Sequence, residues 1–189
     1  MKKLLFCVAL AVGLAGCASL DKGKQVKLHG LIMDADGNGI SDYKVIQGEK
    51  LVGMSNDSGY FDVDAVYGKG IQFILEKENW EKVEFTEEYP DFNKLHVFKV
   101  RSVDSVCTEI EEKLDVRDYG KINTIIDSLQ PEMTGNPRIK YLKALALYKQ
   151  EKYSQALEVL DDEVFSELGE VGARELMIML EKIIGGKNG

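Results

Sequence analysis

The stretch KVRSVDSVCTEIEEKL, residues 99–114, decides the predicted fold, because the spacing of apolar residues changes within it. Before it, from residue 25 to about 101, apolar and polar side chains alternate, as they do in strands that bury one face. After it, apolar residues recur at three- and four-residue steps, beginning with Val103 and Val106, which is the period of an amphipathic helix. We therefore expect a boundary near Arg101–Ser102 between a strand half and a helical half.

The strand half contains about seven short alternating segments that are separated by glycine and asparagine turns. The expected strands are residues 25–33, 42–48, 50–55, 59–65, 70–77, 80–85 and 94–101. Short strands divided by turns at this spacing are typical of a β-sandwich. We therefore predict an all-β antiparallel sandwich over residues 25–101.

The helical half repeats after 34 residues, which is the period of the tetratricopeptide repeat. At this interval Tyr119 pairs with Tyr153, and residues 141–160 resemble the repeat, with the small Ala156 where two helices cross. The resemblance implies an all-α helical-repeat domain with a closing helix over residues 102–189. The predicted fold class is thus two domains, an all-β sandwich of about seven strands followed by an all-α, tetratricopeptide-like domain.

Outward charged residues of the helical half are candidates for partner binding. Arrays of this repeat present a concave surface made by their first helices, which commonly receives a peptide or a helix of a partner protein. The residues expected on that surface are Glu109, Lys113, Lys140, Lys143 and Arg174. The resemblance implies a protein partner for them; the alternative is that they are solvated charges on ordinary amphipathic helices.

Residues 34–45, DADGNGISDYKV, begin like the calcium loop of an EF-hand, with oxygen donors and a glycine at the required early positions. An EF-hand also needs a bidentate carboxylate at the twelfth position and helices on both sides. Val45 occupies that position in this chain, and the residues before Asp34 alternate like a strand. We therefore expect a tight turn in which Gly37 or Gly39 supplies a positive φ angle.

A family resemblance begins at the same turn. GLIMDADGNGISDYKVI (30–46), followed by VGMSNDSGYFDVD (52–64), resembles the carboxypeptidase regulatory-like domain, which is a transthyretin-like sandwich. The residues that match its pattern are Gly30, Asp34, Gly39, Val45, Ser55, Asp57, Gly59 and Phe61. Ile40–Ser41 stand where that family customarily has a proline after the turn. The resemblance implies an accessory module without catalytic residues.

The first sixteen residues, MKKLLFCVALAVGLAG, combine two lysines with a 13-residue uncharged run that is too short to span a bilayer comfortably. The tetrad Leu14-Ala15-Gly16-Cys17 resembles the lipobox of bacterial lipoproteins. The resemblance implies a signal peptide over residues 1–16, acylation of Cys17, and attachment to a membrane through that lipid.

A short tether, residues 17–24, would follow the anchor. The eight residues after Cys17, ASLDKGKQ, extend to about 28 Å at most. The first folded unit is therefore expected close to the membrane surface. Ala18 is not the aspartate that commonly retains enterobacterial lipoproteins in the inner membrane, so by that analogy the expected address is the bacterial cell envelope at the outer membrane, with the face left open.

Charge and cysteine content narrow the function classes. Loss of two lysines with the signal takes the formal net charge from −8 to −10. No nucleic-acid partner is therefore expected, since phosphate binding needs a basic surface.

Of three cysteines, Cys7 is expected to leave with the signal and Cys17 to be acylated. Cys107 then stands alone, so no internal disulfide is expected, and we assign it to the core.

The histidines and acids of the strand half are the candidate metal ligands of the chain, but their spacing does not match a known metal site. His29 and His96 lie in the first and last expected strands, and with Asp34 or Asp36 they would make a zinc site, but no ligand spacing supports one. A calcium ion held loosely by Asp34 and Asp36 is the other alternative at this turn. Three further acids pose the same choice between a cation and solvent: Asp57, Asp62 and Asp64. We expect no metal and no cofactor.

Trp80 and Tyr89 could form part of a surface that contacts a sugar or a peptide. The alternative is that they are buried in the core of the sandwich. No glycine-flanked nucleophilic serine, phosphate loop or paired cysteine motif occurs, so no catalytic residue is expected. The sequence therefore predicts a non-enzymatic, membrane-anchored cell-envelope lipoprotein that acts as a protein-interaction or scaffold module. The alternative is a surface glycan- or nutrient-binding accessory lipoprotein.

Overall fold

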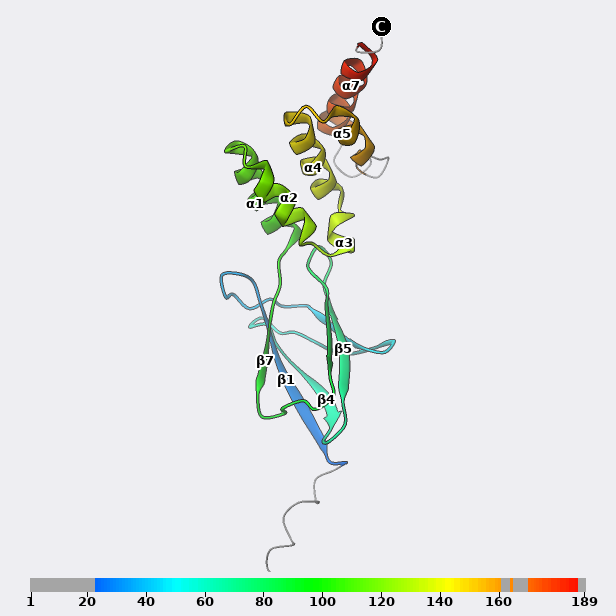
Figure 1. Ribbon diagram of the computed structural model, residues 1–189. Coiled ribbons are helices and arrows are strands. Elements are labelled where there is room, and N and C mark those ends of the chain that lie inside the picture. Colours follow the sequence, from blue (N-terminus) through cyan, green and yellow to red (C-terminus); the bar gives the residue numbers. More distant parts are fainter. Residues whose placement is uncertain (1–22, 161–163, 165–169, 187–189) are drawn as a thin grey trace, which may run out of the picture. The chain divides into compact units, whose positions relative to one another are not determined.

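The computed structural model describes residues 23–160, 164 and 170–186 (Figure 1). The expected signal peptide, Cys17 and most of the tether lie outside these residues. Seven strands come first along the described chain: β1 (Gln25–Met33), β2 (Lys44–Gln47), β3 (Lys50–Met54), β4 (Tyr60–Val66), β5 (Ile71–Glu76), β6 (Val83–Glu87) and β7 (Leu95–Lys99). Six described helices follow: α1 (Val103–Asp115), α2 (Tyr119–Asp127), α3 (Pro131–Thr134), α4 (Pro137–Lys149), α5 (Tyr153–Val159) and α7 (Glu170–Gly186).

The strands form two sheets. One has three strands in the order β4-β1-β7, and the other has four in the order β3-β2-β5-β6. β1 and β4 are antiparallel, with Leu28 opposite Val63 and Gly30 opposite Phe61. β2 and β3 are also antiparallel, and their register shifts between Val45 and Ile46. Alternate residues of β1, β4 and β5 are buried, as expected for strands with one face in a core.

Four phenylalanines join the two sheets. Phe61 and Phe98 come from the three-stranded sheet, whereas Phe73 and Phe85 come from the four-stranded sheet. Neighbouring rings among them have centroids 4.9 to 6.0 Å apart, mostly edge to face. Such ring pairs add to the free energy gained by burying the apolar surface. The core of the strand unit is therefore built from the facing sides of both sheets.

The DADGNG stretch is a tight turn, as predicted. The Asp34 carboxylate accepts hydrogen bonds from the backbone N–H and the side-chain amide of Asn38, at 2.8 and 3.0 Å. Gly37 supplies the positive φ angle, at +88°. These hydrogen bonds hold the pKa of Asp34 below its ordinary value. The carboxylate thus serves the turn itself.

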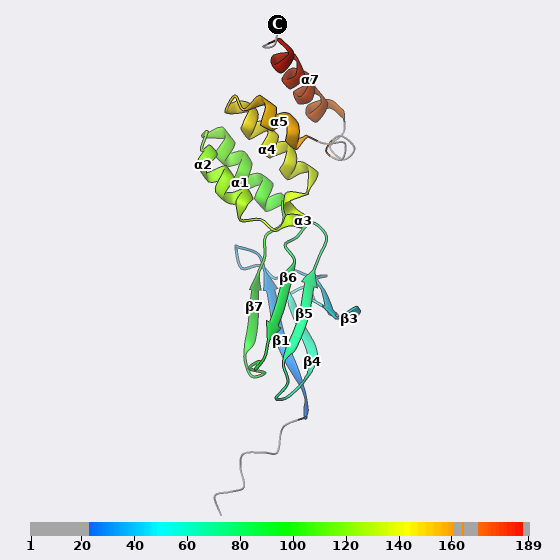
Figure 2. The same ribbon diagram turned by 45° about the vertical axis from the view of Figure 1, so that its right-hand side comes forward.

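The six described helices are labelled in Figure 2. Side-chain caps at helix starts and two apolar clusters stabilise their arrangement. Ser102 and Asp118 cap α1 and α2 through side-chain oxygens that accept backbone N–H bonds. α1 packs against α2 and α4, and α5 packs against α4 and α7. One apolar cluster, around Ile110 and Ile122, joins α1, α2 and α4, and a second, around Ala156, joins α4, α5 and α7.

Two compact units divide the chain, and their residues are interleaved along the sequence. The strand unit holds the described residues up to Ile32 together with Gly39–Leu75 and Glu84–Phe98. The helical unit holds the described residues from Lys99 onward together with Met33–Asn38 and Glu76–Val83. Two segments of the sequence's strand half therefore belong with the helices.

The predicted fold class, an all-β sandwich followed by an all-α tetratricopeptide-like domain, is wrong. The described chain has an α/β fold, in which sheets of three and four strands precede six described helices and the helices share their unit with segments Met33–Asn38 and Glu76–Val83. The reason is physical: hydrophobic period reports which face of a segment is buried, but it does not report which segments pack together. The boundaries proposed from the sequence stay a prediction.

One expected strand, residues 80–85, also starts too early. The sixth strand begins at Val83, and Trp80 instead forms an isolated antiparallel bridge with Ser102, the residue that caps α1. The backbone N–H of Val103 donates to the carbonyl oxygen of Asn79 at 2.8 Å. Asn79 and Trp80 are therefore part of a connecting segment that is hydrogen-bonded to the start of α1.

Candidate functional site

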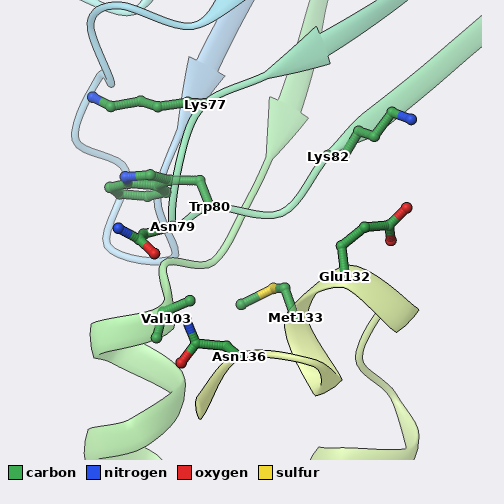
Figure 3. A pocket seen from close by; sticks show the side chains of 8 residues that line it. All are labelled: Lys77, Asn79, Trp80, Lys82, Val103, Glu132, Met133 and Asn136. Carbon is green, nitrogen blue, oxygen red and sulfur yellow. The ribbon is translucent and has the colours of Figure 1, made fainter. Parts of the chain in front are cut away.

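The segment Glu76–Val83, between β5 and β6, forms one wall of a cleft in the helical unit (Figure 3). Its volume is about 220 Å³. Eight residues line it: Lys77, Asn79, Trp80, Lys82, Val103, Glu132, Met133 and Asn136. All of them belong to the helical unit, and the helical side is supplied by the start of α1, by α3 and by the residue before α4.

Hydrogen bonds hold this wall in place. Glu81 accepts three bonds from Arg101, from the backbone N–H at 2.8 Å, Nε at 2.9 Å and Nη2 at 2.7 Å. The Gln130 side chain accepts from the backbone N–H of Lys82 at 3.0 Å and donates to its carbonyl oxygen at 2.6 Å. The residues that follow Trp80 are thus anchored to other residues of the helical unit, which fixes this wall of the cleft.

Trp80 is the central side chain of the cleft. It is partly buried, and the Lys77 ammonium lies 5.6 Å from the centroid of its indole ring, a cation–π contact. Figure 3 shows Lys77 on one side of the ring and Val103, Met133 and Asn136 on the other. The buried Val103 and Met133 make the floor of the cleft apolar.

Asn79 and Asn136 bring amide groups to the cleft. Asn79 has a positive φ of +63°, a conformation that asparagine tolerates better than most residues, and the turn is closed by a 3.1 Å bond from the Trp80 N–H to the Lys77 carbonyl. Asn136 caps α4, with Oδ1 accepting from the Arg138 N–H at 3.0 Å. Within the described part of the chain, the Asn136 Nδ2 group and the Asn79 amide have no hydrogen-bond partner.

Charge in the cleft is mixed and slightly positive. Lys77 and Lys82 stand against the single carboxylate of Glu132. Figure 3 shows Lys82 and Glu132 at one end and Lys77 at the other. A cationic ligand would meet repulsion from two ammonium groups, so neutral or acidic ligands fit this charge pattern better. None of the eight lining residues is a histidine, cysteine, serine or aspartate.

Tyr89, the other aromatic candidate, belongs to the strand unit and not to the unit that holds Trp80. It lines a separate pocket of about 230 Å³ with Tyr67, Gly68, Pro90 and Phe92. The two aromatic candidates are therefore parts of different sites.

The predicted partner-binding residues lie on three helices. Glu109 and Lys113 are half-buried and one turn apart on α1; Lys140 is half-buried and Lys143 exposed on α4; Arg174 is exposed on α7. α4 contacts both α1 and α7. Their role in binding a partner stays a prediction.

The two histidines have their own partners. His29 Nδ1 lies 2.5 Å from the Tyr60 hydroxyl, and His96 Nε2 lies 3.2 Å from the Asp91 carbonyl oxygen. Among the described residues, no three metal-ligating side chains form a group.

Cys107 is 1% exposed in the core of the helical unit, as expected, and burial raises the pKa of its thiol.

Most of the cleft was not foreseen from the sequence, which singled out Trp80 alone. Asn136 followed by Pro137 is a readable helix start, because asparagine is a preferred N-cap and proline a preferred first residue. Nothing in the linear pattern brings that cap near Trp80, 56 residues earlier. The convergence depends on tertiary structure.

Comparisons with known proteins do not assign a family. No family model matches the chain. No curated protein matches it. A matching solved structure is 3-chlorocatechol 1,2-dioxygenase from Rhodococcus opacus 1CP, at 10% identity and a TM-score of 0.28, with 44% of this chain covered. The match spans 60% of the length of that protein, and a similarity this low carries no argument.

Within the described residues, no helix is both long and apolar enough to cross a membrane.

Proposed function

We propose that this protein is a non-enzymatic, lipid-anchored protein of the bacterial cell envelope that binds a sugar ring in the Trp80 cleft. The lipid anchor rests on the lipobox-like tetrad that ends at Cys17. The binding function rests on one observation: the indole ring of Trp80 and two amides line one ordered cleft, and a carboxylate stands at its other end beside Lys82.

Sugar rings suit this combination of groups. A pyranose presents C–H groups on one face, which pack on an aromatic ring, and hydroxyl groups at its rim, which bond to amides and carboxylates. Asn79 and Asn136 supply amides near Trp80, and Glu132 supplies a carboxylate at the other end of the cleft. The cleft volume is below the roughly 300–1,000 Å³ typical of sites for drug-sized ligands, so the cleft has room for about one ring.

Preorganisation favours a binding site over an accidental gap. A site whose walls are already ordered loses less entropy when it binds a ligand. The Glu81–Arg101 and Lys82–Gln130 hydrogen bonds order the wall that carries Trp80. Asn136 is ordered by its role as the N-cap of α4.

Intrinsic fluorescence tests the proposal directly, because Trp80 is the chain's single tryptophan. We would titrate the mature protein with glucose, N-acetylglucosamine, glucuronic acid and glucosamine, and with their oligomers. We expect saturable changes in emission with neutral or acidic sugars and weaker binding of cationic glucosamine. Glu132→Gln and Asn79→Gly should weaken binding, whereas Glu112→Gln, an exposed change on α1, should not. No saturable response to any sugar, by a chain with native circular dichroism, would contradict the proposal.

A protein partner on the helices is the second candidate. Ile178 and Met179 of α7 are 54% and 45% exposed, beside the exposed Arg174. Deleting the helices would strip Glu76–Val83 of its partners, so point changes are the sharper test. Affinity capture should lose a specific partner with Lys143→Glu plus Arg174→Glu and keep it with Lys121→Glu on α2. Unchanged capture by the double variant would remove this candidate.

A further inference from the structure

The loops after β4 and β6 place an aromatic group at one end of the strand unit. The group, which we call the aromatic loop cluster, consists of Tyr67, Tyr89, Pro90 and Phe92 around a pocket of about 230 Å³. The Tyr67 and Phe92 rings have centroids 6.0 Å apart. The backbone of the first loop, at Gly70, lies against that of Glu87 and Glu88, so the two loops are neighbours.

Much of this cluster faces outward. Tyr89 is 82% exposed and Tyr67 46% exposed, although both side chains are largely apolar. The loop that carries Tyr89 is ordered by Asp91, whose carboxylate accepts from the Asn93 N–H at 3.0 Å and whose carbonyl accepts from the Lys94 N–H at 3.2 Å. Pro90 is buried. The loop therefore holds Tyr89 out of the core instead of folding it in.

The described chain begins against the same cluster. The N–H of Gly23 donates to the Tyr67 carbonyl at 3.2 Å, and the Tyr67 N–H donates to the Lys24 carbonyl at 2.9 Å. Cys17 precedes Gly23 by six residues, which span about 20 Å at most when extended. A lipid on Cys17 would thus keep this end of the strand unit within about 20 Å of its membrane.

We propose that the aromatic loop cluster contacts the interfacial region of the bilayer that holds the Cys17 lipid. This inference rests on the proposed lipid anchor. Tyrosine is enriched where membrane meets water, because its ring is apolar and its hydroxyl remains hydrated. The cluster would add a second contact beside the lipid anchor.

Charge near the cluster indicates which lipids matter. Lys24, Lys69 and Lys94 are exposed in these segments, and so are Glu88 and Asp91. The two signs nearly balance, so attraction to anionic lipids contributes little. Contact should therefore occur on neutral, phosphatidylcholine vesicles and change little with salt.

A fluorescent reporter tests the contact. Trp80→Phe removes the natural tryptophan, and Tyr89→Trp places a reporter in the cluster. Asp57→Trp, also on Trp80→Phe, is the matched control, because Asp57 is exposed in the turn before β4, at the other end of that strand. The seven residues of β4 separate the two positions by about 23 Å.

The mature chain, residues 17–189, would be attached through the Cys17 thiol to maleimide lipids in vesicles that contain brominated phosphatidylcholine. Cys107 is 1% exposed and should be spared. We expect at least threefold stronger quenching at position 89 than at position 57, with a blue shift at 89 alone. Hydrogen exchange of the unsubstituted, tethered chain should slow at residues 87–94 relative to the free chain.

Equal quenching at both positions, or unchanged exchange at residues 87–94, would overturn the membrane contact. The chemical tether does not depend on acylation in the cell, so these outcomes do not bear on the anchor itself. Globomycin treatment of cells tests the anchor separately: failure to accumulate the unprocessed precursor would refute acylation of Cys17 and leave the vesicle result standing.

Discussion

Arg101 and Glu81 form a three-point contact in which the backbone N–H, Nε and Nη2 of Arg101 all donate to the Glu81 carboxylate. The two side chains are only 32% and 15% exposed. The contact joins the connection before β6 to the residue that precedes the α1 cap. It is one reason why residues from the strand half of the sequence belong to the helical unit.

Arg101→Ala should lower the free energy of unfolding by about 1–2 kcal/mol, because it removes the guanidinium that makes two of the three hydrogen bonds to a partly buried carboxylate. Arg138→Ala is the matched control, since its ion pair with Asp104 is 47% and 81% exposed and should contribute less than about 0.5 kcal/mol. Urea unfolding followed by circular dichroism measures both. Equal losses in the two variants would show that the Glu81 contact has no special role.

Gly59→Ala should destabilise the protein far more than Gly48→Ala. Both glycines have positive φ, at +79° and +63°. A Cβ at position 59 would lie 2.1 Å from the carbonyl oxygen of Ile32, whereas one at position 48 would meet nothing within 4 Å. We expect about 1 kcal/mol for Gly48→Ala from backbone strain and at least about 3 kcal/mol for Gly59→Ala. Thermal unfolding of the two variants checks the difference, and similar melting temperatures would contradict it.

Substitutions of Asn136 should separate helix capping from ligand binding. Asparagine and aspartate cap helices about equally well, so Asn136→Asp should change stability by only about a few tenths of a kcal/mol, whereas Asn136→Ala should cost about 1 kcal/mol. Both changes remove the amide donor that faces the cleft, so each should weaken sugar binding about fivefold to tenfold. Fluorescence titration and urea unfolding measure the two effects. Full affinity in Asn136→Asp would show that the amide takes no part.

Asp34 should add acid sensitivity to its turn. Hydrogen bonds from Asn38 lower the pKa of the folded state below the ordinary 3.8, so the stabilisation is fully present above that value and is lost as pH falls through the folded pKa. Asn38→Ala should raise the pKa of Asp34 toward 3.8. NMR titration of the Asp34 carboxyl carbon in the two proteins measures the shift. An unchanged Asp34 titration would show that the hydrogen bond from the Asn38 side chain does not cause the low pKa.

Cys107 should resist thiol reagents in the folded chain. It is buried among the α1 and α4 residues, and its raised pKa leaves little thiolate at neutral pH. In the unacylated mature chain, Ellman's reagent should modify one thiol rapidly, at Cys17, and a second only after denaturant is added. Two thiols that react at equal rates without denaturant would contradict the burial of Cys107.

Several features of the protein could be read from the sequence. The alternation before residue 101 and the three- and four-residue steps after Val103 report which face of each segment is buried, and this depends on local order alone. The DADGNG turn was also readable, because Val45 replaces the carboxylate that calcium needs and Gly37 accepts a positive φ. The acylation implied by the lipobox-like tetrad at Cys17 stays a prediction.

Tertiary structure alone decided which segments share a unit and where the candidate site lies. Hydrogen bonds from Val103 to Asn79 and between Gln130 and Lys82 join residues 24 and 48 positions apart, and no period in the sequence encodes such contacts. The same holds for the backbone bonds that set Tyr67 beside Gly23. Sequence therefore determined the local elements and the expected anchor, whereas long-range hydrogen bonding and packing decided the cleft, because those interactions depend on proximity in space.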